Sequence, residues 1–369
     1  MIYVIMFTFS TFFAYLASHS KDRGSRYFFS VICILLPCII GGIRQVGVGF
    51  DTRVYALPHY SAAARAASFI DFLAADIRLY KEISWALLTY VSAKVFHSIN
   101  WSFFFHQLIT LTCIYAALYK HRKIVSLPFA WLIFFLVMHG PTYNFIRQSI
   151  AASIIFLGFN NLEERRYGRF LLYIIAGASF HTSAVIVVSY FIVFHIFTTC
   201  ETSNTRIHHI LLNLSLAAVI AVRPIMGFII RLFPLFSAYQ GFENAVGKSI
   251  LEGSAIAGLE LGELLIFTIY SKGMRRVFAK GNMYKFYRYN LWFQVIYRLF
   301  VRVFAYRILY FFDMVNIILL ASLPSCIREK TLRILVSVFV FITAVMFYVA
   351  VFVIKNGHRT FPYIAIIEL

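Results

Sequence analysis

Long apolar runs recur along nearly the whole chain, and short clusters of charged residues separate them. A bilayer core needs about 20 apolar residues per helix, so each long run predicts a transmembrane helix. Backbone polar groups in hydrocarbon must be satisfied internally, and the runs are too long for barrel strands, so an all-α polytopic membrane protein is expected. The pattern predicts about twelve spans, near residues 2–18, 27–43, 101–119, 124–139, 143–160, 170–197, 208–222, 225–240, 258–271, 289–304, 305–322 and 333–354.

The charged clusters between these runs predict the orientation of the chain. Basic clusters lie at 19–26, 120–123, 163–169, 272–288 and 327–333. Cytoplasmic loops are enriched in Lys and Arg, so these clusters should face the cytoplasm, with both termini and the segment 44–100 on the outer face. The run 83–99 would break this alternation if it spanned, so we interpret it as an interfacial or re-entrant helix. With no repeat or linker visible, we expect a single transmembrane domain over 1–369, with an outer-face loop region near 44–100.

Composition agrees with this class and removes others. The chain is 61% apolar and only 13% charged, too little polar surface for a soluble protein of 369 residues. The net charge of +19 is explained by the cytoplasmic clusters, so no nucleic-acid partner is expected. The five cysteines lie mostly inside apolar runs without ligand spacing, which indicates packing residues, not a disulfide framework or a zinc site.

Arginines inside or at the ends of predicted spans are the clearest chemical signal. They are Arg44, Arg147, Arg298, Arg302 and Arg307. Each could extend its side chain to the lipid headgroups, or face a wet cavity or a charged partner. Several together favour a pocket for phosphate or diphosphate, because a guanidinium group stays charged and binds two oxygens at once.

Two further residues could take part in catalysis. Asp51 lies in a glycine-bearing stretch after Arg44, where it could form a salt bridge or contact a ligand. His181, inside an apolar run, could be a general base or a hydrogen-bonded packing residue. The chain has no HExxH, GxSxG, P-loop or DxD motif, so we expect no metal and no cofactor.

Five short motifs, in order along nearly the whole chain, resemble those of the EpsG/Wzy-type polysaccharide polymerases. They are Arg44-x-Val46-Gly47 followed at a longer spacing by Asp51 and Tyr55, the segment Tyr143 to Gln148, Phe180-His181-Thr182-Ser183-Ala184, Arg307-Ile308-Leu309-Tyr310-Phe311, and Pro362-Tyr363. The family's acidic-Gly-Tyr feature is only partly present, in Tyr80-Lys81-Glu82-Ile83-Ser84.

The resemblance implies a glycosyltransferase of the GT-C type in the bacterial cytoplasmic (inner) membrane. Such enzymes join oligosaccharide repeat units carried on undecaprenyl diphosphate, in O-antigen or exopolysaccharide synthesis, and need neither metal nor nucleotide. A polysaccharide chain-length regulator is an expected partner, beside membrane lipid. Asp51, His181 and Arg147 are then candidate catalytic residues, with Asp51 and His181 as alternatives for the acceptor. The candidate substrate-binding residues are Arg44, Tyr55, Gln148, Arg302, Arg307, Tyr310 and Tyr363.

Other functions remain open from the sequence alone. A flippase or exporter of the same lipid-linked glycan would also need a basic cavity, although no inverted repeat is visible. Another membrane transferase, such as an O-antigen ligase or an acyltransferase, would use similar chemistry. A structural membrane subunit is the third alternative.

Overall fold

The computed structural model describes residues 1–75, 81–189, 191–192, 195, 250–279, 283–301 and 305–366. Within these residues every regular element is helical. The chain divides into two compact units, each described here by itself: a first unit of Met1–Val187 and Met314–Leu369, and a second of Val188–Asp313. Two of the predicted spans, 208–222 and 225–240, lie outside the described residues.

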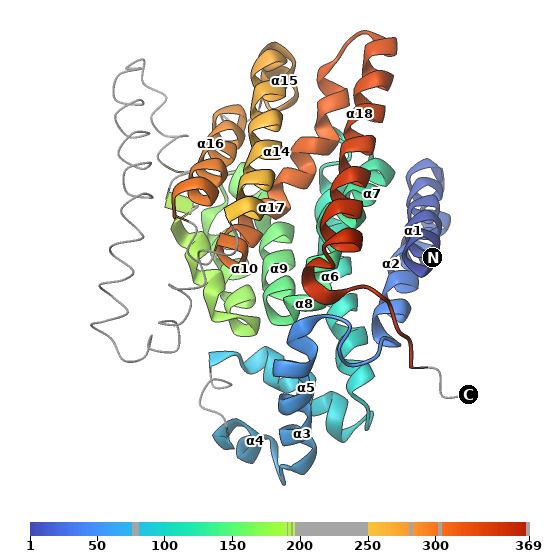
Figure 1. Ribbon diagram of the computed structural model, residues 1–369, viewed down its shortest axis with the longest axis vertical. Coiled ribbons are helices and arrows are strands. Elements are labelled where there is room, and N and C mark those ends of the chain that lie inside the picture. Colours follow the sequence, from blue (N-terminus) through green and yellow to red (C-terminus); the bar gives the residue numbers. More distant parts are fainter. Residues whose placement is uncertain are drawn as a thin grey trace. The chain divides into compact units, whose positions relative to one another are not determined.

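The first unit contains most of the described helices (Figure 1). They are α1 (Ile2–His19), α2 (Arg23–Gly42), the π-helical η1 (Thr52–Ala56), α3 (Leu57–Arg65), α4 (Phe69–Ala75), α5 (Ile83–Lys94), α6 (Ile99–Lys120), α7 (Leu127–Val137), α8 (His139–Asn144), α9 (Ile146–Glu163), α10 (Tyr167–Phe180), the 3-10 turns η3 (Thr182–Ile186), η8 (Leu323–Cys326) and η10 (Gly357–Arg359), α18 (Lys330–Tyr348) and its π-helical continuation η9 (Val349–Ile354).

Among the described residues, five helices are long and apolar enough to cross a membrane. They cover Ile2–His19, Arg23–Gly42, Ile99–Lys120, Arg307–Cys326 and Lys330–Ile354, and shorter apolar helices cover Leu127–Val137 and Tyr167–Phe180. The described part of the chain is therefore all-helical, and its long apolar helices are those of a membrane protein. At 12 residues α5 is only about 18 Å long, too short to cross a bilayer.

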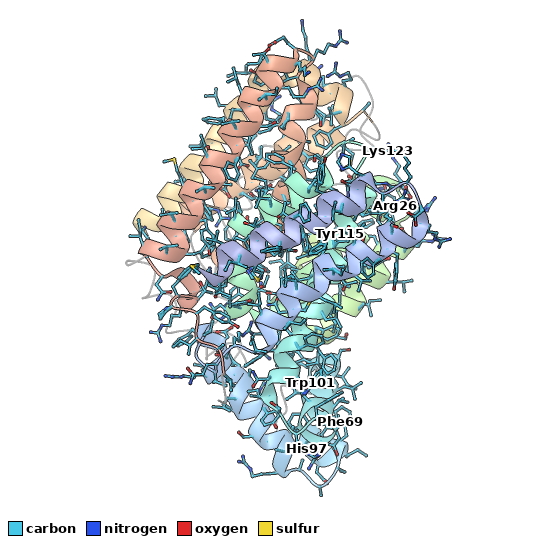
Figure 2. All side chains as sticks on the ribbon, turned by 90° about the vertical axis from the view of Figure 1, so that its right-hand side faces the viewer. Arg26, Phe69, His97, Trp101, Tyr115 and Lys123 are labelled. Carbon is cyan, nitrogen blue, oxygen red and sulfur yellow. The ribbon has the colours of Figure 1, made fainter. Side chains whose placement is uncertain are left out.

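The two ends of the first unit differ in chemistry. Figure 2 shows Arg26 and Lys123 at one end and Phe69, His97 and Trp101 at the other. At the basic end, His121 pairs with Glu163 through Nε2 and Oε2, 3.0 Å apart, which joins the end of α6 to the end of α9. At the opposite ends of these helices, Ile99 and Phe103 of α6 share a buried cluster with Ile146 and Ile150 of α9, which places the start of α9 away from the basic clusters.

A small group of helices covers the end of the unit opposite the basic clusters. Here α3, α4 and α5 pack around Phe72 and Trp85, which are fully buried. Both belong to one apolar cluster that also contains Ile146 and Ile150 of α9. Burying a large apolar side chain contributes about 1.5–3 kcal/mol, so these contacts hold the start of α5 against the start of α9.

The C-terminal tail fixes the loop between α2 and η1. The Gln45 amide donates to the Ile364 carbonyl, and the Ile366 amide donates to the Ile43 carbonyl, each at 2.8 Å. The Tyr3 hydroxyl donates to the Thr360 carbonyl at 2.8 Å. Both chain ends therefore lie at the same end of the unit as this loop.

The second unit contains α14 (Ile250–Ile269), α15 (Ser271–Val277), α16 (Met283–Ile296) and the π-helical η7 (Tyr297–Val301), followed by the first part of α17 (Ala305–Ser322). The Phe267 and Tyr284 rings stack with centroids 4.9 Å apart, so α14 and α16 pack as a helical hairpin.

Gly49 lies in the loop between α2 and η1 of the first unit, and its replacement tests how tightly that loop is held. Its φ of +92° suits glycine, and a Cβ at this position would overlap the Tyr143 carbonyl of α8. We expect Gly49→Ala to lower the stability of the protein by about 2 kcal/mol or more, measured as the thermal unfolding midpoint in detergent. Gly168→Ala is the matched control, because a Cβ there meets only open space within α10. An unchanged midpoint in Gly49→Ala would show that the loop is not held by α8.

Candidate active site

Arg147 is positioned by a sharp break between two helices. Helix α8 ends at Asn144, and Phe145 has φ −84° and ψ 57°, outside the helical region, so the helix is interrupted before α9 begins at Ile146. Arg147 therefore lies on the first turn of α9. The unpaired amides at a helix N-terminus add partial positive charge to that of the Arg147 guanidinium group. Both therefore favour a negative group at this position.

Glu82 pairs with Arg147 from the start of α5. Its Oε2 forms a salt bridge with Nη1 of Arg147, and only 7% of the Glu82 side chain is exposed. The packing of Trp85 and Ala86 against Ile146 and Ile150 brings these two helix starts together. The apolar residues next to Glu82 in α5 and next to Arg147 in α9 therefore position the ion pair.

His181 completes the cluster on the other oxygen of Glu82. Its Nδ1 lies 2.7 Å from Glu82 Oε1, and the Thr182 amide donates to the same oxygen at 3.3 Å. Helix α10 ends at Phe180, and His181 adopts an extended conformation that carries its ring away from the helix. A hydrogen bond of 2.8 Å between the Ser84 and Ser179 hydroxyls ties the start of α5 to the end of α10.

Tyr55 also contacts Arg147. The guanidinium carbon is 5.2 Å from the centroid of the Tyr55 ring, a cation–π contact. Arg147, Tyr55 and His181, three residues that the sequence singles out separately, are therefore brought together around Glu82. We call Arg147, Glu82 and His181 the Glu82 cluster.

The Glu82 carboxyl is ionised in this setting. Burial alone would raise its pKa, but the hydrogen bond from His181 and the Arg147 charge outweigh burial and hold the pKa below its usual value of 4.5. The carboxylate accepts only, so Nδ1 of His181 carries the proton in this contact and Nε2 keeps a lone pair when the ring is neutral.

Arg44 occupies a different environment. Its side chain is fully buried, with the guanidinium carbon 4.5 Å from the Phe103 ring centroid and 4.3 Å from that of Tyr143. Within the described part of the chain, its three guanidinium nitrogens have no hydrogen-bond partner. Arg44 thus contacts α8 through Tyr143, which lies just before the helix break that precedes Arg147.

The remaining predicted residues of the first unit surround these groups. Asp51 is buried, and its amide donates to Oδ1 of Asn144 in α8 at 3.0 Å. Gln148 is buried on the first turn of α9, beside Arg147. The Tyr363 hydroxyl donates to the Ile40 carbonyl, so this residue anchors the C-terminal tail to α2.

The other predicted arginines belong elsewhere in the chain. Arg307 and the buried Tyr310 lie on the first turns of α17, within the second unit. Arg302 lies outside the described residues.

Glu82 was not among the residues chosen from the sequence. It was visible only as one charge among many in the segment 44–82 and as part of an incomplete acidic motif. Glu82 stands immediately before an apolar helix in a chain with few acids. This signal becomes informative once the partners of Glu82 are known. In the described residues, no group of three or more His, Cys, Asp or Glu could hold a metal ion.

These observations define a class: a helical membrane protein with a partly exposed Arg–Glu–His site, built on a buried glutamate, where three helices meet. The sequence matches the EpsG family over residues 26–365, nearly the whole chain, and the protein belongs to this family. The family suggests a polysaccharide polymerase-type activity. No curated protein and no solved structure matches the chain.

The shared carboxylate gives the cluster a specific pH dependence. Glu82→Gln leaves Arg147 without its counter-charge, so we expect a loss of about 1–3 kcal/mol of stability at pH 7, seen as a lower unfolding midpoint. Because the folded-state pKa of Glu82 is depressed, its stabilisation is present above pH 4.5 and lost as pH falls further. The difference between the wild type and Glu82→Gln should therefore persist from pH 8 to about 5 and shrink below pH 4.5.

Glu164→Gln serves as the control for this comparison, because its side chain is 46% exposed and its pair with Arg166 is at the surface. We expect little change in that variant. Equal midpoints for Glu82→Gln and the wild type at pH 7 would contradict a stabilising role for the Glu82 carboxylate.

Proposed function

We propose that this protein polymerises oligosaccharide repeat units carried on undecaprenyl diphosphate, at the outer face of the bacterial cytoplasmic membrane. Two findings support the proposal. Membership of the EpsG family suggests polymerase-type chemistry. The Glu82 cluster supplies a base and a cation for such a transfer, at the end of the first unit opposite the basic clusters.

The observation that carries the proposal is that one carboxylate binds both functional groups. Glu82 accepts from His181 on Oε1 and from Arg147 on Oε2. It thereby fixes the distance between a group that can take a proton and a group that can bind a phosphate. A fixed geometry of this kind lowers the entropic cost of bringing acceptor and donor together.

His181 is the residue that we assign to the acceptor sugar. With Nδ1 held by Glu82, Nε2 can accept the proton of a sugar hydroxyl, and the resulting imidazolium is stabilised by the adjacent carboxylate. The alternative base, Asp51, has its backbone anchored on Asn144. The hydrogen bond between His181 and Glu82 favours His181 for this role.

Arg147 is the residue that we assign to the leaving group. Nη1 is used by Glu82, and 17% of the side chain is exposed, so the rest of the guanidinium group can reach a ligand. A guanidinium edge and a helix N-terminus at one place suit a diphosphate, whose negative charge grows as it departs.

The proposed step is a single displacement. The acceptor hydroxyl oxygen attacks the anomeric carbon of the donor sugar, and a new C–O glycosidic bond forms. The bond from that carbon to the diphosphate oxygen breaks, and its electron pair leaves with undecaprenyl diphosphate. The hydroxyl proton moves to Nε2 of His181. The diphosphate is already an activated leaving group, so the step requires no nucleotide and no metal.

Other residues have supporting assignments. Tyr55 can stack on a sugar ring while holding Arg147 in place. Arg44 contributes positive charge from its buried aromatic setting, and Arg302, Arg307 and Tyr310 remain candidate contacts for the lipid carrier. Membrane lipid and a polysaccharide chain-length regulator are the proposed partners.

Arg147→Ala is the test of this proposal. The purified variant is given a lipid-linked repeat unit in vesicles, and the glycan length is read by gel electrophoresis and mass spectrometry. We expect loss of at least about 100-fold in extension rate, with only single-unit glycolipid remaining, because the developing diphosphate charge is no longer stabilised. Arg147→Lys should recover only part of the rate, since an ammonium group lacks the fork geometry.

Arg122→Ala is the matched control, because Arg122 is exposed at the basic end, where it contacts Tyr119. This variant should keep normal polymer. Normal polymer in Arg147→Ala would remove Arg147 from the mechanism. Movement of the lipid-linked unit across the vesicle without a change in length would support a flippase instead, and transfer of finished glycan to a new anchor would support a ligase.

A further inference from the structure

The second unit contains a separate buried ionic cluster that the proposed function does not use. Nε of Arg298 donates to Oε1 of Glu260 at 2.7 Å, and Nη2 donates to Oδ1 of Asp313 at 2.7 Å. Arg298 and Glu260 are 5% and 4% exposed and the Asp313 side chain is 19% exposed, so most of this network is shielded from water. One guanidinium thus serves two carboxylates from two different helices.

A third carboxyl, Glu263, lies beside this network without joining it. Glu263 follows Glu260 by three residues on α14, so both side chains share one face of the helix. Its Oε2 is buried and has no hydrogen-bond partner in the described residues, and the same is true of Oε2 of Glu260. The charged groups that act on Glu263 there are Glu260, Asp313 and Arg298.

The balance of charge decides the state of Glu263. If Glu260 and Asp313 are ionised, they already exceed the single positive charge of Arg298. An ionised Glu263 would add a third negative charge in an apolar setting, where an unpaired ion costs several kcal/mol or more and the group becomes neutral instead. We propose that Glu263 is a proton-binding site, held as a neutral acid at neutral pH beside the Arg298 network.

The ligand of this site is a proton, not a metal ion. A cation site would need carboxylate oxygens that converge on one point. Among the described residues, no three or more acids are placed so that they could hold a metal ion. Buried acids in membrane proteins that keep a proton next to an ion pair are the kind of group used to store or pass protons. The site is independent of the Glu82 cluster, so it stands whether or not the polymerase proposal is correct.

Dicyclohexylcarbodiimide tests the protonation state directly, because it is apolar and reacts with neutral carboxylic acids. The acid oxygen bonds to the central carbodiimide carbon, the acid proton moves to a carbodiimide nitrogen, and the adduct rearranges to an N-acylurea with nothing lost. The full-length protein is labelled in lipid nanodiscs at pH 7, and the modified peptides are mapped by mass spectrometry.

We expect the label on Glu263 and its loss in Glu263→Gln. Glu164, which is 46% exposed and paired with Arg166, should remain unlabelled and is the internal control. Labelling of Glu263 only after unfolding in acid, with none in the folded protein at pH 7, would overturn the proposal.

Thermal unfolding gives a second, independent measure. Glutamine resembles a neutral glutamic acid, so Glu263→Gln should leave the unfolding midpoint within about 1 °C of the wild type, whereas Glu260→Gln should lower it by several degrees, since it removes a charge partner of Arg298. Equal and large losses in both variants would mean that Glu263 is an ionised member of the network, which would also overturn the proposal.

Discussion

The first unit depends on one carboxylate that is shared between two partners. Glu82 pairs with Arg147 and His181, and the three residues come from three separate segments of the chain. A buried ion of either sign would be costly without such a partner. The apolar core around Phe72 and Trp85 brings the start of α5 to the start of α9, and the Ser84–Ser179 hydrogen bond brings the end of α10. Packing therefore determines the geometry, and the charges make that geometry chemically useful.

The neighbouring backbone is held by contacts across long distances in sequence. The C-terminal tail pairs with residues 43–45, and Gly49 fits against the Tyr143 carbonyl because it has no side chain. The loop that carries Arg44 and Asp51 is thus held between the tail and α8. The break after α8 then places Arg147 at a helix start, where the charge of the side chain and the helix dipole act together.

The two buried ionic clusters differ in their balance of charge. In the Glu82 cluster, one acid faces an arginine and a histidine, so the carboxylate is stabilised as an ion and the histidine keeps a free nitrogen for chemistry. Around Arg298, three acids face one arginine, so the cluster has an excess of acid. We therefore propose a reactive site for the first cluster and a proton-binding site for the second, because the ratio of acids to basic groups differs between them.

The sequence by itself determined the membrane class, because long apolar runs leave helices as the only stable form in lipid. Its motifs also indicated the EpsG family and drew attention to Arg147, His181 and Tyr55. Only the tertiary structure showed that these three meet, that Arg44 is enclosed by Phe103 and Tyr143, and that Glu82 joins the site. Side-chain partners separated by 65 to 99 positions are set by helix packing, and periodicity along one chain carries no information about which helices touch.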